Sequence, residues 1–238
     1  MIVLEILLIK KAERIMIKKQ AMKEAIEKYK KNNNQRWAFG NKVLYDLCKE
    51  HIEHNNNHII VAKIWLIGRS YAAAIERRKN TDDNADDFYY DVVAPKIKEK
   101  GKELDKRINT INGYDNPLNE DKIRYIIKTH SFLMSIFKCI SGQNKRSLAS
   151  KYLHFHCPDY FFIYDSRAAS HIGAYVTKDS DLFNKVIKDM KEKDYDVEYC
   201  NYFLKSFQIS KYAKKECHID LSPRDIDNII YYNNADVI

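Results

Sequence analysis

The chain has 238 residues, 45% of them hydrophobic, which is enough to fill the core of one generous domain or of two small lobes. Lysine and arginine outnumber aspartate and glutamate by 41 to 33, so polyanions such as nucleic acid are favoured partners, although an A+T-rich genome would also enrich lysine. The five cysteines are scattered and never form CxxC, which indicates neither a disulfide framework nor a zinc ribbon and fits a cytoplasmic protein.

Residues 1–35 are predicted to form a basic, helical N-terminal extension, with its most regular helix from Ile17 to Lys31. The apolar run at its start is far shorter than the roughly 20 residues that a membrane span requires. It also lacks a small-residue cleavage site, so we expect neither a membrane anchor nor a signal peptide.

Helices are predicted to dominate the rest, because six glycines and four prolines are few and apolar residues recur at intervals of three and four. Two helices are expected from about Trp37 to His51 and from about Ile59 to Arg78. The second carries Arg69 and Tyr71, which are candidates for contacts with a phosphate or a flipped base. An ordinary buried helix with a basic end accounts equally well for both residues.

The middle of the chain continues as helix after a polar loop over 80–87. A helical pattern begins at Phe88, with a break near Pro95, and a turn follows over 112–117, where glycine, asparagine and proline occur together. The next helix runs from Glu120 to about Ile140. No stretch alternates with period two, so the predicted fold is all-α, with a small strand pair left open.

A short turn over 141–144 leads into a helix that begins at Arg146 or Ser147. This helix should end by Cys157, because Pro158 disfavours helical backbone in the residue before it and lacks an amide hydrogen. The apolar tether 161–164 then leads to Asp165 or Ser166 as the N-cap of another helix. This order of helix, linker, tether and helix fixes the position of the Asp165 carboxylate. The carboxylate could take part in catalysis or act only as a helix cap.

The segment from Ile140 to about Ala174 resembles the catalytic motif of the helix-hairpin-helix DNA glycosylases, over about 35 residues. As in the adenine-mismatch branch of that family, a serine, Ser147, follows an arginine at the helix start. A small residue, Ala149, comes two positions later, and Asp165 follows Ser147 by 18 residues. The hairpin departs from the family's Gly-x-Gly turn, because it has a single glycine, Gly142.

The resemblance implies a two-lobed helical domain over 36–238 with a helix-hairpin-helix-like element and the site at the junction of the lobes. Such a protein would flip a modified or mispaired base out of duplex DNA and cleave its N-glycosidic bond. We expect no cofactor or metal, because the iron–sulfur cysteine cluster of some family members is missing from this sequence. Asp165 would stabilise positive charge on the sugar. Lys145 and Arg146 would contact a DNA phosphate in place of the missing glycine's amide, and Arg167 is a further candidate for contact with DNA.

Lys151 lies four residues after Ser147, on the same helix face. A lysine nucleophile would form a Schiff base with the sugar and give lyase activity. The family's lysine corresponds to Ser147, however, so a monofunctional enzyme is expected, and a surface lysine is the simpler interpretation of Lys151. His154 and His156 point apart on a helix and are not expected to bind metal.

Near the end of the chain, Ser222 precedes a proline and predicts the N-cap of a last helix through Tyr232. Two other functional classes stay open. The chain could keep the glycosylase fold as a non-catalytic DNA- or RNA-binding module. It could also be a helical interaction protein of a defence or regulatory system.

Overall fold

The computed structural model describes residues 18–31, 37–77, 87–115 and 117–232. Within these ranges the chain forms helices and no strand, which confirms the predicted all-α fold and leaves no strand pair there. None of these helices has both the length and the apolar character needed to cross a bilayer. Most of the predicted N-terminal extension, 1–17 and 32–35, and nearly all of the predicted loop over 80–87 lie outside the described residues.

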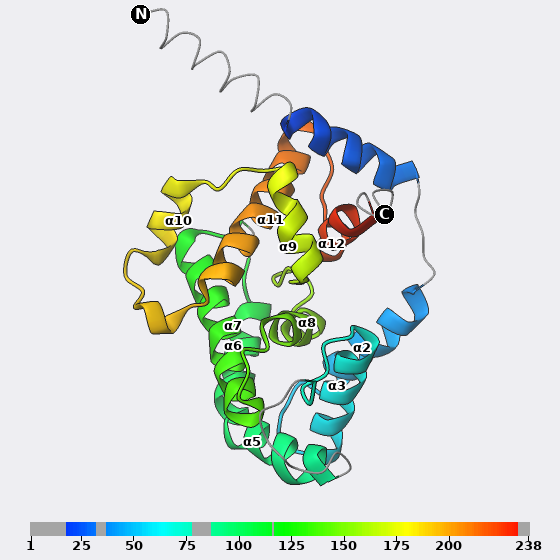
Figure 1. The fold of residues 1–238 in the computed structure, drawn as a ribbon, viewed down its shortest axis with the longest axis vertical. Coiled ribbons are helices and arrows are strands. Elements are labelled where there is room, and N and C mark those ends of the chain that lie inside the picture. Colours follow the sequence, from blue (N-terminus) through cyan, green and yellow to red (C-terminus); the bar gives the residue numbers. More distant parts are fainter. Residues whose placement is uncertain (1–17, 32–36, 78–86, 116, 233–238) are drawn as a thin grey trace, which may run out of the picture.

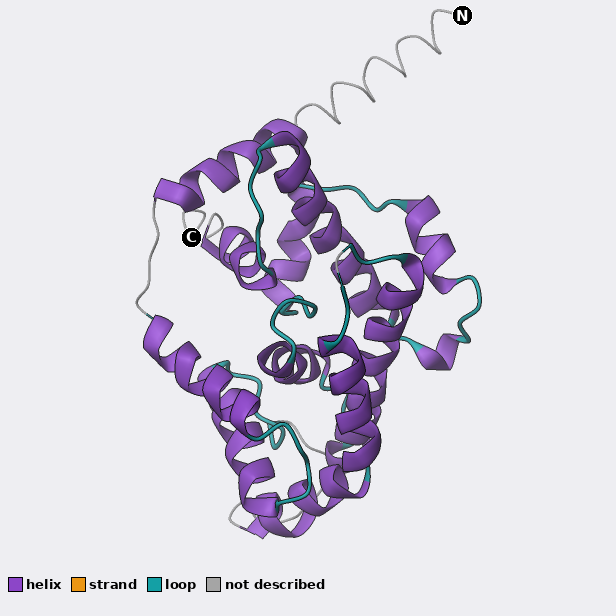
Figure 2. Ribbon diagram, turned by 180° about the vertical axis from the view of Figure 1, so that it is seen from behind, coloured by secondary structure: helices purple, strands orange, loops and turns teal. Residues whose placement is uncertain are grey.

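Figures 1 and 2 show the helices arranged around one central helix, α8 (Arg146–His156), which is seen end-on in both views. Along the chain, a helix over 18–31 is followed by α2 (Ala38–Glu50), α3 (Asn57–Ser70), the π-helix η1 (Phe88–Val93), α5 (Ala94–Glu99), α6 (Gly101–Asn112) and α7 (Glu120–Ser141). After α8 come α9 (Ser166–His171), the 3-10 helix η2 (Ile172–Ala174), α10 (Ser180–Ile187), the 3-10 helix η3 (Glu192–Asp194), α11 (Val197–Glu216) and α12 (Pro223–Tyr232).

Helix α8 packs against α2, α3 and α7, and every residue from Leu148 to His156 is buried. A surface helix buries only one stripe of side chains, so burial of nine consecutive residues means that α8 is enclosed on all sides. The helix ends at His156, as Pro158 predicts. It forms the centre of the hydrophobic core.

Short polar side chains start several helices and satisfy the amides that a helix N-terminus leaves free. Asn119 accepts a hydrogen bond from Lys122 at the start of α7. Asp165 accepts one from the Arg167 amide at 2.9 Å, which confirms the predicted cap of α9. At the start of α12, Ser222 and Asp225 bond each other's backbone amides as a reciprocal capping box.

The prediction that the second helix continues to Arg78 is wrong at its C-terminal end, because α3 ends at Ser70. The chain turns back after Tyr71, where Ala72 adopts a positive φ of 50° and the Ala73 amide donates to the carbonyl of Gly68. A Cβ on Gly68 would lie 3.0 Å from the Cα of Ala74. Glycine at this position therefore allows the chain to fold back close to the end of α3. The neighbouring residues favour helix, so the sequence gives no sign of this turn.

The helix over 18–31 packs on the rest of the molecule through Met22, Ala25 and Ile26, which are buried. The Lys18 ammonium donates to the carbonyl of Gly173 at 2.9 Å. This part of the predicted extension is thus attached to the body next to α9 and α12 (Figure 1).

A hydrogen-bonded cluster around the buried His54 joins α6 to α8. The His54 ring donates from Nδ1 to the Asp105 carboxylate and accepts at Nε2 from the Tyr152 hydroxyl, at 2.5 and 2.8 Å. Gly101, at the start of α6, lies against the His54 backbone, and a Cβ there would be 2.6 Å from the His54 carbonyl oxygen. The position has room for glycine only.

We expect Gly101→Ala to lower the free energy of unfolding by about 1–3 kcal/mol, because backbone must move to admit the methyl group. Gly40→Ala is the matched control, since a Cβ at this exposed position in α2 meets no atom within 4 Å. It should raise stability by up to about 1 kcal/mol through helix propensity. Urea unfolding measures both, and equal stability of Gly101→Ala and the wild type would contradict the contact.

Candidate functional site

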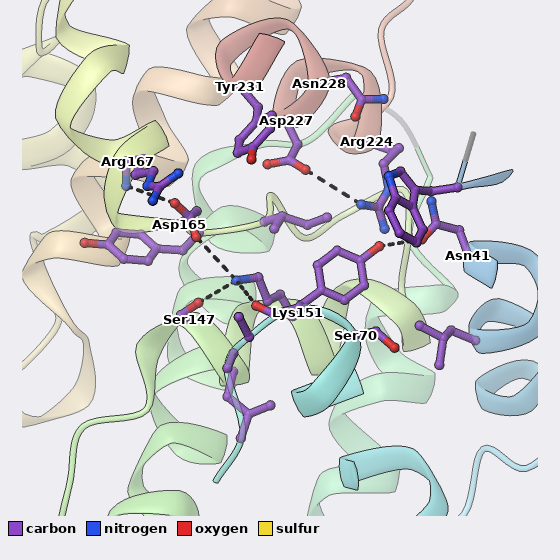
Figure 3. Close-up of a pocket in the computed structure, with 18 of the residues that line it drawn as sticks. Asn41, Ser70, Ser147, Lys151, Asp165, Arg167, Arg224, Asp227, Asn228 and Tyr231 are labelled. Carbon is purple, nitrogen blue, oxygen red and sulfur yellow. Dashed lines mark hydrogen bonds and ion pairs between the residues drawn. The ribbon is translucent and has the colours of Figure 1, made fainter. Parts of the chain in front are cut away.

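A cleft of about 2100 Å³ opens beside the N-terminal end of α8. Its walls come from the start of α2, the turn after α3, the start of α9 and one face of α12 (Figure 3). These segments are far apart in sequence. Ser147 and Lys151 of α8 and Asp165 at the head of α9 lie together in it.

Asp165 is held in place by hydrogen bonds to the apolar tether that precedes it. The Phe161 carbonyl accepts from His154 at 2.8 Å, the Phe162 carbonyl accepts from Tyr199 at 3.1 Å, and the Tyr164 amide donates to Ser150 at 2.9 Å. One carboxylate oxygen of Asp165, Oδ1, caps α9. The other, Oδ2, faces the Lys151 ammonium, so the side chain caps α9 and pairs with Lys151 at the same time.

Lys151 is almost wholly buried, with 4% of its side chain exposed, whereas 35% of the Asp165 side chain is exposed. Its Nζ lies 2.7 Å from Ser147 Oγ and 3.6 Å from Asp165 Oδ2. Burial lowers the pKa of Lys151, and the Asp165 carboxylate opposes part of that shift. The expectation of a surface lysine is therefore wrong, because the side chain extends back towards the N-terminus of an enclosed helix.

The opposite wall of the cleft carries Arg224, which a chain of hydrogen bonds connects to α8. A carbonyl can only accept, so His154 donates from Nδ1 to Phe161 and its Nε2 accepts from the Tyr45 hydroxyl at 2.6 Å. Tyr45 in turn accepts from Arg224 Nε at 3.2 Å. Phe161, His154 and Tyr45 thus fix the position of the guanidinium.

Asp227 lies beside Arg224, one turn further along α12 (Figure 3). Arg224 Nη1 and Asp227 Oδ2 are 3.7 Å apart, close enough for ionic attraction but beyond hydrogen-bond distance. Burial raises the pKa of Asp227 to about 6, although Arg224 and Lys151 act in the opposite direction. The carboxylate form therefore prevails at neutral pH.

Positive charge predominates along the described lining of the cleft. Four carboxylates line it, from Asp165, Glu198, Asp225 and Asp227. Nine basic side chains line it as well: Lys28, Lys31, Lys42, Arg77, Lys145, Arg146, Lys151, Arg167 and Arg224. A concave, basic surface of this kind concentrates polyanions.

Most of the site residues predicted from the sequence meet in this cleft, namely Tyr71, Lys145, Arg146, Ser147, Lys151, Asp165 and Arg167. Tyr71 reaches it from the turn after α3, and its carbonyl accepts from Lys151 at 3.5 Å. The predicted partner of Tyr71, Arg69, is not among the lining residues. Its guanidinium pairs with Glu76 at 2.5 Å.

Arg146, expected at a DNA phosphate, makes ion pairs within the chain. Its guanidinium binds Asp196 through two nitrogens, at 2.5 and 2.8 Å, and Glu198 at 2.6 Å. These bonds connect the start of α8 to the start of α11. Lys145 is placed differently, with its Nζ donating to the Arg77 carbonyl at the cleft.

The sequence predictions omitted the wall formed by α12. Arg224, Asp227, Asn228 and Tyr231 all line the cleft and recur at the intervals of three and four that define one helix face. A polar stripe on a helix whose other face is apolar could have been recognised in the sequence. The sequence could not show which segment this polar face lies opposite, because α12 and α8 are far apart in sequence.

The described residues contain no group of three or more His, Cys, Asp or Glu side chains arranged to hold a metal ion. His154 and His156 each bond a backbone carbonyl through Nδ1, at 2.8 Å in both cases. His154 therefore acts through Tyr45 on the wall of the cleft. The groups that line the cleft include the Lys151 amine, the Ser147 hydroxyl, the carboxylates of Asp165 and Asp227, and the Arg224 guanidinium.

The His154 contact predicts acid sensitivity. Burial lowers the pKa of His154 to about 3, with the Arg224 charge acting in the same direction, whereas an unfolded histidine titrates near 6.5. Between these values the unfolded chain binds more protons, so the stability contributed by the neutral ring is complete above about pH 6.5 and is lost as the pH falls towards 3.

We expect this group to lower the free energy of unfolding by about 1.4 kcal/mol per pH unit below about pH 6. His154→Gln, which cannot titrate, should show a dependence that is shallower by that amount in urea unfolding between about pH 6 and pH 4. The comparison of slopes separates His154 from Asp227, whose raised pKa acts with the opposite sign. Identical slopes in the two proteins would refute the assignment.

Comparison of the chain with protein-family models, with curated proteins and with solved structures finds no match. The cleft combines a buried lysine and a carboxylate at its floor, a guanidinium and a carboxylate on the facing wall, and an excess of cations around them.

Proposed function

We propose that the chain binds DNA in the basic cleft and removes a base by cleaving its N-glycosidic bond. The observation that carries this proposal is the pair formed by Lys151 and Asp165, 3.6 Å apart, at the floor of the cleft. The surrounding excess of basic side chains supports a polyanionic ligand. A flipped nucleotide would bring its sugar to this floor.

Asp165 has the properties that stabilisation of the departing sugar requires. Cleavage of an N-glycosidic bond builds oxocarbenium character at C1′, which a fixed carboxylate stabilises electrostatically. Oδ1 is occupied by the cap of α9, and Oδ2 faces the cleft next to Lys151. The tether bonds hold the carboxylate in position before substrate arrives, so little reorganisation is needed.

The location of the Lys151 amine in the cleft favours it as the nucleophile more strongly than its position in the sequence does. Its side chain spans one helical turn, so that Nζ comes within 2.7 Å of Ser147 Oγ, beside the position where the bifunctional glycosylases have their lysine. The lowered pKa increases the fraction of free amine. We therefore propose Lys151 as the nucleophile, although the sequence alone led us to expect a monofunctional enzyme.

In this step the lysine nitrogen forms a bond to C1′ as the bond from C1′ to the base breaks. The base leaves with the bonding electron pair and takes up the proton that the lysine nitrogen loses. Opening of the sugar ring then gives an imine. This imine either loses a 2′ proton and the 3′-phosphate by β-elimination, which is the lyase reaction, or is hydrolysed by water to regenerate the amine and leave an abasic site. Asp165 stabilises the positive charge that develops on the sugar before the new bond is complete.

We expect Asp165→Asn to lower base release by at least about 100-fold while preserving the fold and the binding of DNA. Asparagine is as good an N-cap as aspartate, so the change removes the charge and keeps the acceptor for the Arg167 amide. The assay exposes duplexes with single modified or mispaired bases to the protein and then to hot alkali, which cleaves abasic sites. Unchanged release from a susceptible duplex would exclude Asp165 from catalysis.

Borohydride should trap the wild-type protein on a susceptible duplex as a covalent complex, because it reduces the imine between Lys151 and the sugar. Lys151→Gln should abolish trapping, whereas Lys214→Gln should leave it intact, since Lys214 pairs with Asp220 on the surface and does not line the cleft. Gel electrophoresis under denaturing conditions measures the complex. Base release without trapping would indicate that water is the nucleophile.

A further inference from the structure

Arg224 occupies a cage of aromatic rings on the cleft wall opposite Lys151. Its Cζ lies 5.9, 5.4 and 5.5 Å from the ring centroids of Tyr45, Tyr71 and Phe155. Aromatic faces attract cations, and cages of this kind bind cationic ligands in many proteins. Here the chain's own guanidinium fills the cage, so these three rings already have their cation.

Asp227 gives the same wall an acceptor next to this donor. Its distance of 3.7 Å from Arg224 leaves both groups with hydrogen-bonding capacity. Their side chains are 18% and 16% exposed, which places them at the lining of the cleft and largely out of solvent. In such surroundings, charge on an approaching ligand has a larger effect than in water.

We propose that Arg224 and Asp227 form a base subsite that accepts uncharged bases with a carbonyl next to a ring N–H and rejects cationic, alkylated bases. The carbonyl oxygen accepts from the Arg224 guanidinium, and the adjacent N–H donates to the Asp227 carboxylate. A base with a positive charge on its ring would approach a guanidinium whose position Tyr45 fixes, and the rings of Tyr45, Tyr71 and Phe155 already face that guanidinium. This inference rests on the proposed function, because it assumes that the ligand is a flipped base.

The opposite charges of Arg224 and Asp227 predict opposite effects on the binding of a cationic base. Arg224 repels a cationic base, whereas Asp227 attracts one. Removal of the positive charge should therefore weaken the preference for neutral bases, and removal of the negative charge should strengthen it. Opposite shifts of this kind cannot arise from general damage to the fold, which would weaken both complexes.

The test compares two duplexes that each carry one altered purine on a 2′-fluoroarabinose sugar, which prevents cleavage of the glycosidic bond. One has hypoxanthine, which is neutral, and the other has 7-methylguanine, which is cationic; both present the same carbonyl and ring N–H. Fluorescence anisotropy measures the dissociation constants of the full-length protein. The wild type should bind the hypoxanthine duplex at least about tenfold more tightly.

Arg224→Gln should bring this ratio close to one, Arg224→Lys should retain it because the charge is kept, and Asp227→Asn should increase it. Lys214→Gln serves as the control with an unchanged ratio. Equal or tighter binding of 7-methylguanine by the wild type would overturn the subsite. So would a ratio that Arg224→Gln and Asp227→Asn shift in the same direction.

Base release from matched duplexes with ordinary deoxyribose separates this inference from the proposed function. Intact discrimination in binding without release of any base would contradict the glycosylase activity and leave the subsite standing. Release of base from both duplexes, without discrimination in binding, would overturn the subsite and leave the activity standing.

Discussion

The enclosure of α8 is the constraint on which the rest of the structure depends. Because every residue from Leu148 to His156 is buried, each polar group of that stretch needs a partner inside the protein. Ser150 and Lys151 find theirs in the segment that follows α8, at Tyr164 and Asp165, whereas His154 bonds Tyr45, 109 residues away in the sequence. The helix thus determines where those segments lie, as well as filling the core.

The same contacts that satisfy α8 build the cleft. The bonds from Ser150 and His154 to the tether position Asp165, and the bond from His154 to Tyr45 positions Arg224. Core and site are therefore one network, and the polar residues of α8 support both. His154 and Tyr45 are the links in this network that position Asp165 and Arg224.

Local signals in the sequence predicted much of this arrangement. The residue before Pro158 ends α8, Asp165 caps α9, and Ser222 opens α12, because each depends only on neighbouring residues. The extent of α3 was mispredicted, since the close approach of Gly68 to Ala74 appears only when the chain folds back. The wall of α12 and the ion pairs of Arg146 escaped prediction for a related reason: each depends on a partner at least 50 residues away.

The enclosure of α8 also has a consequence for motion. Segments open locally with a free energy that reflects how much surface they bury, and a helix covered on all sides opens only when the whole domain unfolds. The floor of the cleft, with Ser147 and Lys151, therefore belongs to the most protected part of the fold. Any adjustment to ligands of different size therefore falls to segments outside α8, such as the turn after α3, while the floor keeps the Lys151 amine in place.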